Sequence, residues 1–156
     1  MVMENPPLSV KERNEHLLKI RTLEKKIQIL EHAFADNGAY FEINLTRNLV
    51  PGTVYQRAGG RKYNVNAAFG LPDDARLSDL TQGVAERLEP EYRTAFLDFW
   101  TPERMIERFR RGEAHQQLAY WVKSVFFEPV FAELNVYLYK DEVTGEVLGV
   151  TTVRDA

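Results

Sequence analysis

The residues able to do chemistry are few and scattered along the chain. Three histidines and no cysteine occur among 156 residues. His16 and His32 fall in a helix-forming stretch and His115 opens a strand-forming one, so none is predicted to ligate haem inside a cavity. Without cysteine, disulfides, thiolate catalysis and cysteine-adduct flavin chemistry are excluded. No histidine and carboxylate grouping has the spacing of a zinc site. We therefore predict no catalytic residue, no metal site and no required cofactor.

Two further groups of residues are predicted to have structural roles and no role in catalysis or phosphate binding. Asp73 and Asp74 follow Leu71-Pro72 and are expected to form a turn that caps the next helix. The run Gly59-Gly60-Arg61-Lys62 is too short for a phosphate-binding loop, because no Lys-Ser or Lys-Thr pair follows it at the start of a helix.

An enzyme remains the main alternative at the sequence level. A small cone-shaped α+β isomerase or dehydratase would need an Asp, Glu or His among apolar neighbours, with a shifted pKa. Glu42, Glu133 and His115 are the strand residues that fit this requirement. If a structure places all three at the surface, the enzyme alternative has no candidate catalytic residue.

Composition narrows the class of protein. The chain is 44% apolar and 12% aromatic, which suffices for a packed core, and its formal charge is −3. An acidic balance argues against a general nucleic-acid-binding protein, which normally carries a basic face. No apolar run approaches the roughly 20 residues of a membrane span, and the first residues do not form a signal peptide. These features predict a cytoplasmic protein with no membrane segment in this chain.

The chain is expected to contain three parts. Residues 1–8 are a flexible lead-in, residues 9–36 an amphipathic, coiled-coil-like helix, and residues 37–156 an α+β module. Ser9 followed by Glu12 is a capping-box pattern. Apolar residues at spacings of three and four predict a dimer-forming stripe on the helix; they are Leu17, Ile20, Leu23, Ile27, Leu30 and Phe34. The same stripe is compatible with a helix that covers its own sheet.

The module shows strand, helix and strand signals in that order. Alternating apolar residues predict strands over 39–45 and 49–57, then over 115–127, 130–140 and 147–153. Between them, three short helices are expected over 78–88, 90–100 and 102–112, and residues 61–77 are expected to form a loop. This order predicts a five-stranded antiparallel sheet with short helices on one face.

Residues 34–155 resemble a PAS sensory domain of the type found upstream of diguanylate cyclases and histidine kinases. Glu89-Pro90-Glu91-Tyr92-Arg93 stands where the family has His-Pro-Asp-Asp-Arg, and Gly112-Glu113 matches the end of a later helix. The run from Lys140 to Gly145, an apolar strand and Val153-Arg154-Asp155 match the family's C-terminal end. Tyr92, Trp121 and Phe131 depart from the pattern, so no pocket chemistry is carried over.

The resemblance implies a homodimeric sensor that regulates an output module, in cis or on a partner protein. Arg154 and Asp155 would be the signal exit, and a small-molecule ligand would occupy a hollow core. Four aromatic residues would line that cavity or, alternatively, fill it; they are Phe96, Trp100, Tyr120 and Tyr137. A purely structural dimerisation module without a cavity is a third interpretation.

Overall fold

The computed structural model describes residues 9–33, 38–122 and 130–155, with the backbone alone for residues 16, 25–33, 130 and 155. The chain divides into two units, Met1–Ala33 and Phe34–Ala156.

The first unit contains helix α1 (Val10–Ala33). The Ser9 hydroxyl accepts a hydrogen bond from the Glu12 backbone N–H at 3.0 Å, as the capping-box pattern predicts. Leu17, Leu18 and Leu23 are about half exposed or more, at 49%, 66% and 53%. The side chains of Ile27, Leu30 and Phe34 lie outside the described residues. No helix in the described part of the chain is long and apolar enough to cross a membrane.

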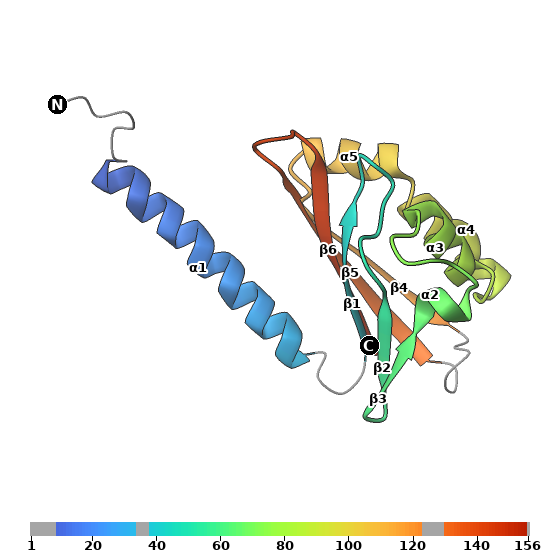
Figure 1. Ribbon diagram of the computed structural model, residues 1–156. Coiled ribbons are helices and arrows are strands. Elements are labelled where there is room, and N and C mark those ends of the chain that lie inside the picture. The colour runs from blue at the N-terminus through green and yellow to red at the C-terminus, as the bar shows by residue number, and fades with distance from the viewer. Residues whose placement is uncertain (1–8, 34–37, 123–129, 156) are drawn as a thin grey trace. The chain divides into compact units, whose positions relative to one another are not determined.

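The second unit is an α+β module built on one antiparallel sheet (Figure 1). Six strands follow the order β3-β2-β1-β6-β5-β4, which places the last strand of the chain beside the first. The strands are β1 (Gly38–Asn44), β2 (Tyr55–Ala58), β3 (Arg61–Asn64), β4 (His115–Val122), β5 (Val130–Lys140) and β6 (Val147–Asp155). The order along the chain is three strands, a helical segment and three strands, and the layout is PAS-like.

The sixth strand corrects the prediction of a five-stranded sheet. Residues 61–64 were expected to belong to a loop, but they form β3, which pairs with β2 through the turn at Gly59 and Gly60. Arg61 and Lys62 are exposed, so this edge strand shows none of the apolar alternation that marks a half-buried strand. Both glycines have positive φ, which a tight turn between two short strands requires.

Four helices connect β3 to β4 and lie on one side of the sheet (Figure 1). They are α2 (Val65–Ala68), α3 (Leu77–Ala85), α4 (Pro90–Phe99) and α5 (Pro102–Arg110). Pro90 and Pro102 occupy the first helical position, where the missing N–H costs nothing.

Helix α3 begins one residue earlier than expected, and its N-cap residue, Arg76, makes no capping hydrogen bond with its side chain. The start of α3 is instead capped from a distance by Asn48, whose side-chain oxygen accepts from the Ser78 backbone N–H at 2.9 Å. Asp73 and Asp74 bond the 52–53 loop rather than a helix end: Asp74 accepts from the Gly52 N–H at 2.6 Å and Asp73 from the Thr53 hydroxyl.

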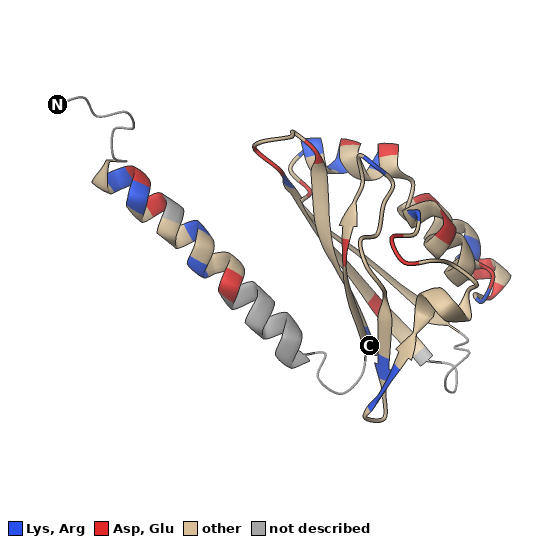
Figure 2. Ribbon diagram, in the orientation of Figure 1, with Lys and Arg blue, Asp and Glu red and all other residues tan. Residues whose placement is uncertain are grey.

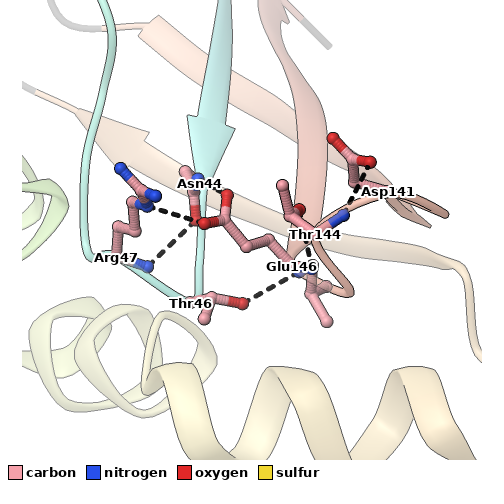
Figure 3. A network of polar contacts seen from close by, with 7 residues as sticks. Asn44, Thr46, Arg47, Asp141, Thr144 and Glu146 are labelled. Carbon is pink, nitrogen blue, oxygen red and sulfur yellow. Dashed lines mark hydrogen bonds and ion pairs between the residues drawn. The ribbon is translucent and has the colours of Figure 1, made fainter.

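A polar network joins the end of β1 to the start of β6, which are far apart in the sequence (Figure 3). The Glu146 carboxylate accepts from the Asn44 amide at 2.8 Å and from the Arg47 guanidinium at 2.6 Å. These donors hold the pKa of Glu146 below its usual range. Thr46 accepts from the Val147 N–H at 2.9 Å. The network therefore fixes the register of β1 against β6.

Candidate functional site

A cavity of about 110 Å³ lies in the core of the second unit, lined by residues of the sheet and of the helical segment. Ala39 and Phe41 of β1, Leu134 of β5 and Val153 of β6 line it on the sheet side. Leu80 and Val84 of α3 line it on the helix side. The residues that line it are predominantly apolar, so the space is suited to an apolar molecule rather than to a chain of waters.

Three of the four aromatic residues named from the sequence line this cavity. Phe96 and Trp100, at the end of the α4 segment, and Tyr120 on β4 are each at most 5% exposed. Phe96 and Tyr120 contact edge to face, with ring centroids 5.2 Å apart. The aromatic residues therefore frame the cavity as well as fill part of the core.

Tyr137 corrects the fourth assignment. Its neighbours Val136 and Leu138 are buried, and the period of two in a strand turns Tyr137 to the opposite face of β5. There its ring stacks on the His115 imidazole at a centroid distance of 4.5 Å. Tyr137 is absent from the cavity lining.

Polar groups also border the cavity, and among them Arg87 was not singled out from the sequence. Arg87 follows α3, and its Nε–H is buried without a hydrogen-bond partner in the described structure. The indole Nε1–H of Trp100 is likewise buried without a hydrogen-bond partner in the described structure. Tyr120 makes no hydrogen bond among the described residues, and burial raises the pKa of its hydroxyl, which therefore stays protonated. No local sequence signal marks Arg87, because its position depends on how α3 packs on the sheet.

The candidates for an enzymatic site lie away from the cavity. Glu42 and His115 are exposed. Glu133 accepts hydrogen bonds from Asn135 at 3.0 Å and from Arg154 at 3.1 Å, and these donors lower its pKa. None of the three lines the cavity. Within the described ranges, no group of three or more His, Asp or Glu residues could hold a metal ion.

The residues predicted to carry the signal out of the module lie at the end of β6. Arg154 forms an ion pair with Glu133 of β5, and the backbone of Asp155 pairs with Ala132. The adjacent Val153 lines the cavity. The end of β6 is therefore continuous with a cavity wall, although the Asp155 side chain lies outside the described residues.

Charged side chains are concentrated away from the middle of the sheet. Figure 2 shows both signs on α4 and α5 and positive side chains on the β2–β3 hairpin, while most of each long strand is uncharged. Arg87 is the charged residue that borders the cavity within the described part of the chain. The cavity thus combines apolar walls with bordering hydrogen-bond donors.

No family model and no curated protein matches this chain. Among solved structures, it is similar to the N-terminal domain of a diguanylate cyclase with a PAS/PAC sensor from Marinobacter aquaeolei, with a TM-score of 0.45 and 17% identity over 76% of this chain and 94% of that one. It is also similar to a PAS domain from a two-component sensor histidine kinase, with a TM-score of 0.38 and 11% identity over 87% and 99% of the two chains. Both likenesses are distant.

Proposed function

We propose that this chain is a cytoplasmic PAS-type sensor domain whose core cavity binds a small molecule. The supporting observation is the cavity itself, because an apolar space bordered by unpartnered donors costs stability until a ligand fills it. Ligand binding would shift β6. This structural change would pass through Arg154 and Asp155 to an output module of the diguanylate cyclase or histidine kinase type. The output module would lie in the same chain or on a partner protein.

The sensor proposal predicts that an occupied cavity changes the end of β6. A single-ring apolar probe, 4-fluorotoluene, is expected to bind with a Kd of about 1 mM, given the affinity per atom of very small ligands. In a titration followed by amide chemical shifts, Arg154 and Asp155 should move with the same Kd as the cavity-lining residues. The amides of Thr144 and Gly145, in the β5–β6 turn that contributes no residue to the cavity lining, should stay in place. Movement confined to α3, α4 and β4 would contradict the proposed exit.

Dimerisation through α1 is the second part of the proposal. Leu17 and Leu23 are about half exposed on that helix, and burying such side chains against a second copy is favourable. A purely structural dimerisation module would share this helix but would make no use of the cavity. A sensor and a structural dimerisation module would therefore both use α1, but only the sensor would use the cavity.

Leu23→Asp tests the helix. Burying an unpaired carboxylate in a dimer interface is expected to cost at least about 2 kcal/mol. The dissociation constant of the dimer should therefore rise by at least about thirtyfold. Light scattering across a dilution series measures the change. Thr22→Asp is the matched control, because this substitution adds the same charge one residue away, at a position outside the stripe. If the Leu23→Asp dimer is as strong as the wild-type dimer, α1 is not the interface.

A further inference from the structure

The cavity borders on two buried hydrogen-bond donors that lack an acceptor within the described structure. The Arg87 Nε–H and the Trp100 Nε1–H have no acceptor within the described structure. The Tyr120 hydroxyl makes no hydrogen bond there and remains a donor, because its burial disfavours the phenolate. No carboxylate is among the residues that line the cavity. An unpaired buried donor is costly, so a ligand that supplies acceptor oxygens gains more here than a purely apolar one.

Arg87 gives that donor set a positive charge. Its Nη1 donates to the Gly83 carbonyl at 2.7 Å, and its guanidinium lies 4.1 Å from the centre of the Phe69 ring. No ion pair involving Arg87 occurs among the described residues. A neutral carbonyl and an aromatic face leave the guanidinium charge without an anionic partner, although a guanidinium is suited to hold a carboxylate by two parallel hydrogen bonds.

The topology brings Arg87 and Tyr120 to the same region of the cavity. Leu88, the residue after Arg87, forms a β-bridge with Val122, and Val122 lies two residues beyond Tyr120 on the same face of β4. Arg87, Tyr120 and Val122 all line the cavity. Arg87 also borders a more polar groove outside, together with Asp79 and Glu86. These two acids line the groove and not the cavity.

Resting on the sensor function proposed above, we infer that the cavity selects a small carboxylic acid with an apolar body, bound as the carboxylate by Arg87, with Tyr120 as a second donor. The cavity volume of about 110 Å³ sets the size of the body. Apolar cavities of about 150 Å³ accept a benzene ring, so a body of roughly one ring fits with modest adjustment.

The test compares a charged and an apolar probe of the same size. Binding of 4-fluorobenzoate and 4-fluorotoluene is followed by fluorine NMR at pH 7 with the wild-type chain, Arg87→Gln and Arg76→Gln. Arg76 is an exposed arginine at the opposite end of α3, so its variant removes the same net charge. Loss of a charge-assisted hydrogen bond should weaken 4-fluorobenzoate binding to Arg87→Gln by about tenfold to a hundredfold. Binding of 4-fluorotoluene should change by less than about threefold, because the apolar walls are unaltered.

Each other outcome counts against the inference in a distinct way. If both probes bind the wild type and Arg87→Gln weakens neither, the cavity is a ligand site but has no selectivity for carboxylates. If 4-fluorotoluene alone binds, the sensor function stands and the ligand is apolar. Equal losses in Arg76→Gln and Arg87→Gln would assign the effect to net charge. If neither probe binds the folded wild-type chain, the ligand-binding function fails together with the inference. Amide NMR spectra of each variant establish that it is folded.

Discussion

Ala39→Leu is expected to abolish probe binding while leaving the module as stable as the wild type or slightly more stable. Ala39 is 5% exposed on β1 and lines the cavity beside Val153, its partner across the sheet. Three added carbon atoms at this position would extend into a space of about 110 Å³. Filling a cavity commonly adds about 0.5–2 kcal/mol of stability, and it removes the volume that a ligand needs.

The measurement pairs binding with unfolding. The Kd for 4-fluorotoluene should rise by more than about thirtyfold, equivalent to about 2 kcal/mol, and the urea midpoint should stay level or increase. Ala119→Leu is the matched control, because it places the same side chain at an exposed site between Leu118 and Tyr120 on β4. That control should bind the probe as the wild type does. If Ala39→Leu is destabilised and still binds the probe with wild-type affinity, the ligand does not occupy this cavity.

Asn66→Leu is expected to lower the free energy of unfolding by about 2–4 kcal/mol, because two backbone groups would lose their partners. Asn66 is 1% exposed. Its side-chain oxygen accepts from the Val54 N–H at 2.8 Å, and its amide donates to the Pro72 carbonyl at 2.9 Å. The residue therefore links α2, the approach to β2 and the loop before α3. Leucine matches its shape but can satisfy neither group.

Asn64→Ala provides the comparison for this variant. Asn64 lies two residues earlier, is exposed, and caps α2 by accepting from the Ala67 N–H at 2.9 Å. Loss of a cap costs about 1 kcal/mol. Urea denaturation of the two variants should therefore show the larger loss for Asn66→Leu. Equal losses would mean that the interior bonds of Asn66 contribute no more than a surface cap.

Many elements of the module could be predicted because their signals are local. Pro90 and Pro102 mark helix starts wherever they lie, since proline has a fixed φ and no N–H to lose. The alternation from residue 130 to 140 predicts a strand because successive side chains must point to opposite faces. The run Asp141 to Gly145 predicts a turn, and Gly145 has the positive φ that such a turn requires.

Other features could not be predicted because their energies come from partners distant in the chain. The segment 61–64 is polar and becomes a strand because β2 supplies its hydrogen bonds. Asn48 caps a helix that begins 29 residues later, at Leu77. Nothing in the neighbourhood of Asn66 or Arg87 indicates that the first is buried and that the second borders a cavity.

The sequence by itself determined the α+β order of elements, the PAS resemblance and the aromatic residues that could surround a hollow core. Only the tertiary structure decided which of these residues surround it. Phe96, Trp100 and Tyr120 do, whereas Tyr137 lies on the other face of β5 against His115. The physical reason is that periodicity defines two faces of a strand, but the choice of the face that meets the helices depends on packing across the whole sheet. The same packing placed Arg87 beside Tyr120's cavity, and with it the charge from which the ligand class is inferred.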